Sequence, residues 1–387
     1  MKVWFFSILC LFCVVWINVN AQVIVGAEQT GAYFPLLKNK RIAVFTNHTG
    51  KIGDEHLVDV LHRNHFNVKS IFAPEHGFRG NGDAGEKIHD EIDEKTGISI
   101  ISLYKNKSGK PMPEQIRQID VLLVDIQDVG TRFYTYYISL YKLMDACAEQ
   151  RKTVILLDRP NPNGFYVDGP ILNMKYKSGV GYLPIPVVHG MTLGELAQMI
   201  NGEKWLPNKR KCKLKVIRCK NYTHQTKYEL PVPPSPNLPN MKAIYLYSSL
   251  CLFEGTVVSL GRGTGFPFQV FGHPDMSGYD FWFTPRSVPG AKNPPCLNQL
   301  CCGVDLRNLP DSVVWAKQFD LSYVIEAYRN LNIGEKFFTP FFRLLIGNNE
   351  IKQMIMDGKS TDEIRETWQS GVEKFKIRRR PYLLYEE

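Results

Sequence analysis

Polar side chains follow four short apolar segments of this 387-residue chain, at the points where those segments end. The segments span residues 42–45, 68–72, 121–126 and 154–157. Amide, carboxylate, imidazole and guanidinium groups offer many directional hydrogen bonds, and neighbouring aromatic rings offer stacking faces. This mixture suits a polyhydroxylated or amide-bearing ligand such as a sugar. The candidate binding residues, including three from later loops, are Asn47, His48, His76, Arg79, Gln127, Asp128, Arg132, Tyr134, Asp158, Arg159, Asn161, His189, Asn237 and Arg262.

Three of these candidates are histidines, the commonest ligands of protein-bound metals. His48, His76 and His189 form neither an H-x-H nor an H-E-x-x-H pattern, so we expect them to make hydrogen bonds and expect no bound metal. Residues 46–50 lack the G-x-G-x-x-G spacing of a dinucleotide-binding turn. The glycine-rich residues 261–265 are predicted to form a loop that lets the backbone approach a ligand. No cofactor is expected.

The apolar segments themselves indicate the fold class. Together with residues 98–103 they make five short runs, separated by stretches of helical length. Such runs are typical of buried parallel strands in βαβ units, and residues 135–150 are the clearest helix between them. We predict an α/β fold with a Rossmann-like doubly wound parallel sheet. Because the carboxyl ends of parallel strands meet at one edge, a polar, aromatic-rimmed cleft is expected there.

The pattern then changes to proline-interrupted loops. A helix is predicted at residues 192–201, where a capping box begins it, and a last strand at residues 212–219. The proline-rich residues 230–239 indicate a domain boundary or, alternatively, a rigid wall of the site. We therefore expect an N-terminal catalytic domain at residues 22–235 and a smaller α+β C-terminal domain at residues 236–387 that closes the cleft. Helices of the second domain are expected near residues 322–330 and 362–374.

The beginning of the chain predicts export. Lys2 precedes an apolar run at residues 3–17, and Ala21 offers a small residue for cleavage, as in a secretory signal peptide. A membrane anchor is the alternative, but the run is short for a bilayer span. We expect residues 1–21 to be removed and the mature protein to be periplasmic or secreted, with no stable membrane anchor. The formal charge of +9 comes from scattered basic residues, so no nucleic-acid partner is indicated.

Seven cysteines remain once the predicted signal peptide is removed, and an odd number leaves at least one thiol unpaired unless chains cross-link. Cys296 lies near the adjacent Cys301 and Cys302, while Cys212 and Cys219 flank the last predicted strand. One or two disulfides would fit an oxidising compartment. The spacing indicates neither a zinc site nor a dense disulfide scaffold.

Six ordered motifs carry a resemblance to a known family. They are PEHGFRG at 74–80, VDIQDVGTRFYTY at 124–136, LDRPNPNG at 157–164, HGMTLGELA at 189–197, PSPNLP at 234–239 and CLFEGTVVSLGRGTGFPF at 251–268. With the YLLY sequence at 382–385, they resemble the NamZ family of exo-acting β-N-acetylmuramidases. The resemblance implies removal of N-acetylmuramic acid from the non-reducing ends of peptidoglycan fragments. It also implies a two-domain protein with a Rossmann-like N-terminal part.

Glycoside hydrolysis needs a carboxylic acid that protonates the leaving oxygen. Under the resemblance we predict that Glu75 is this acid, because it follows a strand closely and because His76 and Arg79 can orient it or set its protonation. The structural alternative is a salt bridge between Glu75 and Arg79 that holds the loop.

A second group must attack or stabilise the oxocarbenium-like centre. Glu254 is the leading candidate, because its apolar surroundings would raise its pKa by desolvation. A structural ion pair between Glu254 and Arg262 is the alternative, and Asp128 and Asp158 are rival carboxylates. In a further route, the substrate's own 2-acetamido oxygen is the nucleophile and a protein carboxylate orients it.

The expected partner is a peptidoglycan-derived sugar or muropeptide, and no pattern in the sequence indicates an oligomeric state. The lactyl carboxylate of a muramyl sugar calls for a charged partner, for which an arginine fork is suited. Arg79, Arg132, Arg159 and Arg262 are the candidates, with Arg79 and Arg132 favoured. Two other functions stay open: a sugar- or muropeptide-binding protein without turnover, and a metal-dependent amidase or esterase acting on cell-wall material.

Overall fold

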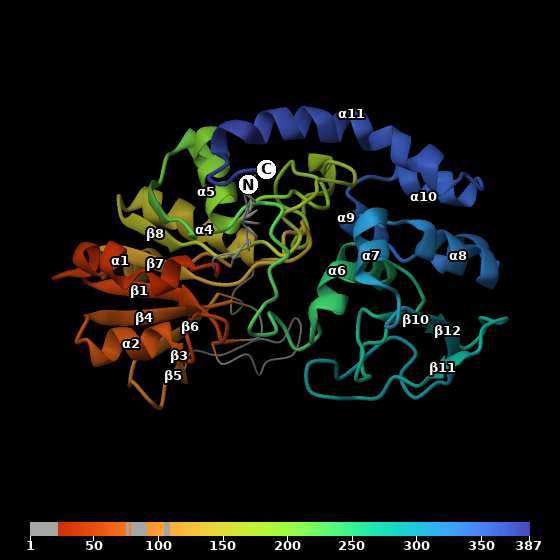
Figure 1. Ribbon diagram of the computed structural model, residues 1–387, viewed down its shortest axis with the longest axis horizontal. Helices are drawn as coiled ribbons and strands as arrows, with labels where there is room; N and C mark the ends of the chain where they lie inside the picture. Colours follow the sequence, from red (N-terminus) through yellow and green to blue (C-terminus); the bar gives the residue numbers. More distant parts are fainter. Residues whose placement is uncertain (1–21, 75–76, 79–90, 104–108) are drawn as a thin grey trace, which may run out of the picture.

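The computed structural model describes residues 22–74, 77–78, 91–103 and 109–387 (Figure 1). The predicted signal peptide lies outside the described residues, as do Glu75, His76 and Arg79. The N-terminal sheet occupies one side of the molecule and the C-terminal elements occupy the other, with helix α11 (Thr361–Arg379) running back toward the sheet (Figure 1). In the described part of the chain, no helix has the length and apolar character needed to cross a membrane.

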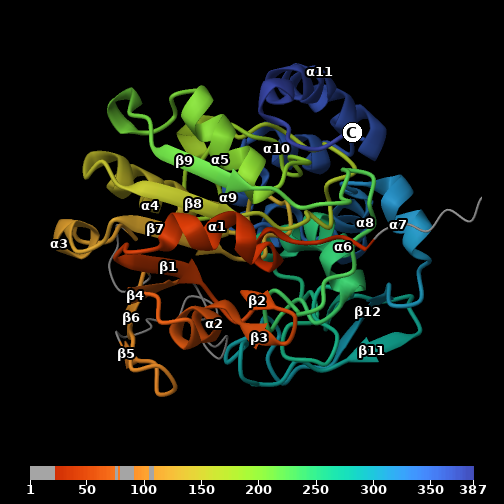
Figure 2. The ribbon, with the colours of Figure 1, turned by 60° about the vertical axis from the view of Figure 1, so that its left-hand side comes forward.

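A seven-stranded sheet organises the N-terminal half, in the order β5-β6-β4-β1-β7-β8-β9 (Figure 2). All neighbouring strands are parallel except the edge pair β5 and β6. The Rossmann-like parallel sheet is therefore confirmed, with one antiparallel edge strand added. The strands are β1 (Ile42–Thr46), β4 (Val68–Ala73), β5 (Glu91–Ile92), β6 (Ser99–Ser102), β7 (Val121–Asp125), β8 (Thr153–Leu157) and β9 (Lys213–Ile217), and β2 (Lys51–Ile52) pairs with β3 (Glu55–His56) in a separate hairpin.

Helices cover both faces of this sheet, which explains why its strands read as continuous apolar runs. In β1, Ile42 and Val44 belong to a core shared with α1 (Thr30–Leu37) and α2 (Leu57–Arg63). Ala43 and Phe45 belong instead to the core on the opposite face, shared with α4 (Tyr136–Glu149) and α5 (Leu193–Gly202). Successive side chains of a strand point to opposite faces, so every side chain of β1 is buried.

The C-terminal half is a smaller mixed α+β unit, as the sequence predicts. Its antiparallel sheet has the order β10-β12-β11, formed by β10 (Val270–His273), β12 (Cys301–Asp305) and β11 (Phe281–Phe283). The predicted helices near 322–330 and 362–374 are α8 (Ser322–Leu331) and α11. The remaining helices of the described chain are α3 (Pro113–Arg117), α6 (Met241–Leu250), α7 (Asp311–Lys317), α9 (Phe342–Ile346) and α10 (Glu350–Met356), with short 3₁₀ turns at Gly26–Glu28, Met174–Tyr176, Pro207–Lys209, Cys251–Gly255, Gly334–Phe337 and Arg380–Tyr382.

One apolar core runs through both halves, and a buried arginine ties them together. Arg132 follows β7 and has no exposed surface. Its Nη1 donates to the carbonyl oxygens of Pro170 and Ile185, at 2.7 and 3.0 Å. Its Nη2 donates to the carbonyl oxygens of Leu345 and Ile346, at 2.8 and 2.9 Å, in the last turn of α9. Because carbonyl groups in a last helical turn lack partners within the helix, Arg132 satisfies them from the other half of the molecule.

Arg132→Met should therefore destabilise the protein strongly, because Met fills much of the space but leaves four buried carbonyl groups without this donor. We expect the free energy of unfolding to fall by about 3–5 kcal/mol in urea titrations. Arg117→Met is the control, since Arg117 is exposed on α3 and forms an ion pair with the equally exposed Glu114, three residues earlier. That change should stay within about 0.5 kcal/mol of wild type. Similar losses in both variants would contradict the role assigned to Arg132.

Candidate functional site

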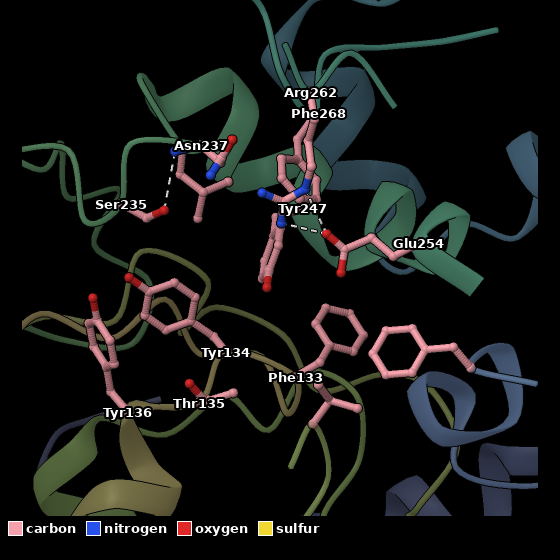
Figure 3. Close-up of a pocket in the computed structure, with 13 residues that line it drawn as sticks. Phe133, Tyr134, Thr135, Tyr136, Ser235, Asn237, Tyr247, Glu254, Arg262 and Phe268 are labelled. Carbon is pink, nitrogen blue, oxygen red and sulfur yellow. Dashed lines mark hydrogen bonds and ion pairs between the residues drawn. The ribbon is translucent and has the colours of Figure 1, made fainter. Parts of the chain in front are cut away.

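A small cavity lies where the loop after β7 meets the C-terminal half (Figure 3). Its volume is about 210 Å³, and we call it the sheet-edge pocket. Aromatic rings make up much of its wall, together with one acidic, one basic and several uncharged polar side chains. The described lining residues are Phe133, Tyr134, Thr135, Tyr136, Val180, Ser235, Asn237, Leu238, Tyr247, Glu254, Arg262, Phe268 and Phe341.

Two tyrosines fix one wall of the sheet-edge pocket to the proline-rich segment. The hydroxyl of Tyr134 donates to the Pro234 carbonyl oxygen at 2.8 Å, and the hydroxyl of Tyr136 lies 3.3 Å from the same oxygen. Asn47 Nδ2 donates to the Tyr136 hydroxyl at 2.9 Å. Burial raises the pKa of Tyr134 well above its ordinary value, so its hydroxyl keeps its proton and can donate. Residues 230–239 thus contribute to the wall of the pocket, which was the alternative interpretation of that segment.

The facing wall carries an ion pair between Glu254 and Arg262 (Figure 3). Glu254 Oε1 accepts from Arg262 Nε at 2.8 Å and also from Nη2. The Arg262 guanidinium lies 5.0 Å from the centre of the Phe268 ring, as in a cation–π contact. Burial disfavours the Arg262 charge, but Glu254 outweighs it and raises the Arg262 pKa. Glu254 therefore forms the ion pair with Arg262 that was the alternative interpretation of the sequence, and its surroundings are not purely apolar.

Asp128 is not among the lining residues of the pocket and has a different environment. Its side chain is almost fully buried, and Oδ1 accepts from the Gly130 backbone at 2.7 Å. Oδ2 is buried and has no hydrogen-bond partner among the described residues. Burial raises the pKa of Asp128 to about 7, because the charged form loses its hydration. This carboxyl group is therefore protonated in a substantial fraction of molecules near neutral pH.

Asp158 and Arg159, the carboxylate and guanidinium candidates after β8, bond to neighbouring segments of the fold. Asp158 accepts from Thr192 Oγ1, the Gly194 backbone and the Tyr385 hydroxyl, at 2.7, 2.9 and 2.7 Å. Burial raises the pKa of Asp158 to about 6. Arg159 donates to both oxygens of Asp125, at 2.6 and 3.0 Å, and to a backbone carbonyl. These interactions place neither Asp158 nor Arg159 in the wall of the sheet-edge pocket.

The remaining amide and imidazole candidates bond to the loops of the sheet edge. His48 Nε2 lies 2.8 Å from the Pro233 carbonyl oxygen, and Gln127 Nε2 donates to the carbonyls of Asp128 and Pro160. Asn161 Nδ2 donates to the Met191 carbonyl. His189 Nδ1 accepts from the Met191 backbone, and burial lowers the His189 pKa to about 3, so the ring is neutral. Among the described residues, no group of three or more His, Cys, Asp and Glu side chains is arranged to hold a metal ion.

The structure thus divides the sequence candidates into two sets. Tyr134, Asn237, Glu254 and Arg262 line the sheet-edge pocket. Arg132, although expected to face the cleft, directs its donors to backbone carbonyls because the last turn of α9 needs them. The sequence reasoning missed Tyr247 and Phe268, both of which line the pocket. Tyr247 lies within the apolar helix α6, where nothing in the spacing distinguishes a pocket residue from a core residue. Glu75, His76 and Arg79 lie outside the described residues.

Comparisons with known proteins cover nearly the whole described chain. Family models described as the N-terminal and C-terminal parts of exo-β-N-acetylmuramidase NamZ match residues 42–242 and 245–385. The peptidoglycan β-N-acetylmuramidase NamZ of Bacillus subtilis is 37% identical over 373 residues, covering 91% of this chain and 89% of that protein.

Two crystal structures of DUF1343 family proteins from Bacteroides fragilis share the fold. One has a TM-score of 0.90 and 64% identity, covering 95% of this chain and all of the other. The second has a TM-score of 0.81 and 26% identity, covering 94% of this chain and 99% of the other.

Asp128→Asn should change how stability depends on pH. The Asp128 pKa of about 7 lies above the value of about 4 for an unfolded aspartate, so the folded protein binds this proton more tightly. The resulting stabilisation is complete below pH 4 and is lost as the pH rises through 7. Because Asn cannot ionise, we expect the free energy of unfolding of the variant to gain roughly 2–4 kcal/mol relative to wild type between pH 4 and pH 8.

Urea unfolding across this pH range measures the effect. Asp54→Asn, at an exposed position between β2 and β3, is the control and should follow the wild-type profile. A constant offset between Asp128→Asn and wild type at every pH would show that Asp128 does not titrate in this way.

Proposed function

We propose that this chain, which belongs to the exo-β-N-acetylmuramidase NamZ family, releases N-acetylmuramic acid from the non-reducing ends of peptidoglycan fragments. The family consists of peptidoglycan-cleaving glycoside hydrolases, and the resemblance found in the sequence motifs is confirmed by both family models. The reaction breaks a glycosidic bond by adding water, so it needs acid catalysis and charge stabilisation.

The volume that the described residues enclose in the sheet-edge pocket is the observation that supports the exo-acting part of the proposal. At about 210 Å³ it is smaller than the usual ligand pocket of about 300–1,000 Å³. A cavity of this size suits one terminal sugar, whereas a polymer threaded through the site needs an open groove. Rings of Tyr134, Tyr247 and Phe268 offer apolar faces, and Asn237 and Ser235 offer hydrogen bonds.

The ion pair between Glu254 and Arg262 supports different catalytic roles for two carboxyl groups. Arg262 donates to Glu254 Oε1 through two nitrogens, so this carboxyl group already has a cationic partner in the pocket wall. A carboxylate in the wall can stabilise positive charge at the anomeric carbon or orient the substrate's acetamido group. The step that protonates the leaving oxygen then needs a second carboxyl group. We assign that step to Glu75, which follows β4 with only Pro74 between.

Turnover of a chromogenic β-glycoside of N-acetylmuramic acid by the purified chain tests the function directly. Stepwise release of single sugars from the non-reducing ends of longer fragments tests the exo-acting mode. Tight binding of these compounds without turnover would favour a binding protein instead. Activity confined to amide or ester bonds of cell-wall material, and abolished by EDTA, would favour a metal-dependent amidase or esterase.

Glu75→Gln should lower the turnover of a muramyl disaccharide by about two to four orders of magnitude, because Gln cannot donate the proton. A nitrophenyl glycoside should lose much less, since its leaving group needs little protonation. Turnover numbers for the two substrates, measured with both enzymes, give the comparison. Equal losses would indicate a positioning role, and wild-type rates on both would remove Glu75 from the mechanism.

Arg262 is also the described arginine best placed to recognise the lactyl carboxylate of a muramyl sugar. Arg132 and Arg159 are engaged elsewhere in the fold, whereas Arg262 lines the pocket. Glu254 occupies its Nε and Nη2, and Nη1 makes no hydrogen bond to the described residues. A nitrogen donor is thus available on the guanidinium for a second carboxylate.

Arg262→Ala should therefore reduce the preference for muramyl over glucosaminyl substrates. We expect a loss of about 2–5 kcal/mol in transition-state binding for the muramyl substrate and a much smaller loss for its glucosaminyl analogue. The ratio of kcat/KM for the two substrates separates this effect from general damage to Glu254. Arg307→Ala is the control, since Arg307 pairs with Asp305 at the surface of the same half. Retention of the full preference by Arg262→Ala would place lactyl recognition elsewhere.

A further inference from the structure

Two thiols lie against each other in the C-terminal half, outside the lining of the sheet-edge pocket. Cys301 is fully buried at the start of β12, in a small apolar cluster with Val270 and Phe283. Cys296 packs against the same cluster and is only partly buried. The chain reverses between them, with the Gln299 backbone donating to the Cys296 carbonyl oxygen at 3.0 Å. The Cys296 and Cys301 side chains are in hydrogen-bonding contact.

The other contacts of these sulfur atoms are weak. Cys296 Sγ lies 3.7 Å from the Val257 carbonyl oxygen, and Cys301 Sγ lies 3.7 Å from that of Gln299. The contact between the thiols lowers the pKa of Cys296 and raises that of Cys301. Cys296 is thus the sulfur with more thiolate character and also the more accessible one, and both properties favour attack on an external disulfide.

We propose that Cys296 and Cys301 form an intramolecular disulfide, with a low-molecular-weight disulfide as the oxidant. The Cys296 thiolate attacks one sulfur of the oxidant and displaces its first thiolate, giving a mixed disulfide. The Cys301 thiol then loses its proton and attacks the Cys296 sulfur, which displaces the second thiolate. Two protein thiols are oxidised to one cystine, one external disulfide is reduced to two thiols, and the two protons pass to the two departing thiolates.

The adjacent Cys302 is excluded as a partner by the geometry of the strand. Neighbouring residues of a strand point to opposite faces, so Cys301 and Cys302 enter different apolar clusters. Cys302 Sγ lies 3.5 Å from the Tyr279 carbonyl oxygen, on the other side of β12. Of Cys296, Cys301 and Cys302, it is therefore Cys296 and Cys301 that pack against the same apolar cluster.

The disulfide would hold the segment at residues 285–298 in place, and this segment supports one side of the sheet-edge pocket. Arg286 donates from its backbone to the Gly263 carbonyl oxygen at 2.8 Å, next to Arg262. Asn237 Nδ2, in the pocket wall, donates to the Gly290 carbonyl oxygen at 3.0 Å. The backbone of Asn298 donates to the Pro285 carbonyl oxygen at 2.8 Å. A link from Cys296 to β12 fixes the end of this segment and restricts the unfolded chain.

Peptide mapping of the whole protein tests the proposal. The protein is equilibrated in buffers of oxidised or reduced glutathione, and its free thiols are then alkylated in denaturant. Chymotrypsin can cut after Leu297 and Leu300, so digestion with this protease separates Cys296 from Cys301. In the oxidised sample we expect a cross-linked peptide pair that is lighter than the sum of its reduced parts by two hydrogen atoms. The other cysteines should carry the alkyl label.

Cys301→Ala and Cys302→Ala form a matched pair of variants. The first should lose the cross-link and the second should keep it. Oxidised wild type should melt about 2–5 °C higher than reduced wild type, and this difference should vanish in Cys301→Ala. Should Cys301→Ala fail to fold, Cys296→Ser replaces the more exposed partner and makes the same prediction. Alkylation of both Cys296 and Cys301 in the oxidised wild type, or a link to Cys302, would overturn the proposal.

Discussion

The arrangement of the sheet-edge pocket depends on one buried cation. Arg132 has no exposed surface, and its four hydrogen bonds reach carbonyl groups from both halves of the chain. Burial lowers the Arg132 pKa to about 10, which still leaves the group charged at neutral pH. The charge is tolerated because oriented carbonyl dipoles replace the lost water. Gly347 follows α9 at a φ of +84°, and a Cβ there would come within 2.7 Å of Arg132 Nη2. Since Phe133 to Tyr136 follow Arg132 directly, fixing this guanidinium also fixes the aromatic wall of the pocket.

Carboxyl groups at the same sheet edge have different roles because their oxygens are satisfied differently. Asp125 is held by Arg159, and Asp158 accepts three hydrogen bonds that join α5 and the C-terminal segment to the sheet. Asp128 accepts from the Gly130 backbone, and its Oδ2 has no hydrogen-bond partner among the described residues. Glu254 comes from the other half of the chain and receives two nitrogens of Arg262. Burial raises the pKa of Asp128 to about 7, whereas Asp125 and Glu254 each face a guanidinium. The carboxyl groups near the sheet edge therefore differ in the partners that surround them.

The sequence predicted the sheet better than it predicted the partners of individual side chains. The runs at 42–45, 68–72, 98–103, 121–126 and 154–157 form strands of the sheet, because helices on both faces bury apolar side chains at successive positions. The antiparallel edge strand β5 was missed, since two exposed residues, Glu91 and Ile92, carry no such pattern. Four of the candidates line the sheet-edge pocket: Tyr134, Asn237 and Arg262 from loops, and Glu254 from the 3₁₀ turn Cys251–Gly255. Arg132 was expected at the same cleft and was not found there. Its acceptors are backbone carbonyls far along the chain, and no residue type in the sequence marks a carbonyl group as unsatisfied.

Contacts among protein groups fix the side chains of the pocket wall, and one strained residue illustrates how. Phe268 has a φ of +57°, a left-handed conformation that is unfavourable for an aromatic residue, by about 1–3 kcal/mol. The conformation persists because the surroundings determine it: the Phe268 backbone donates to the Leu260 carbonyl oxygen at 2.8 Å, its ring packs edge-on against Tyr247, and Arg262 lies over its face. Arg262 is in turn held by Glu254, so an aromatic wall and a charged pair constrain one another. Ordering these side chains is therefore completed during folding. A sugar that binds here does not have to immobilise them, which leaves more of its interaction energy for distinguishing the transition state from the ground state.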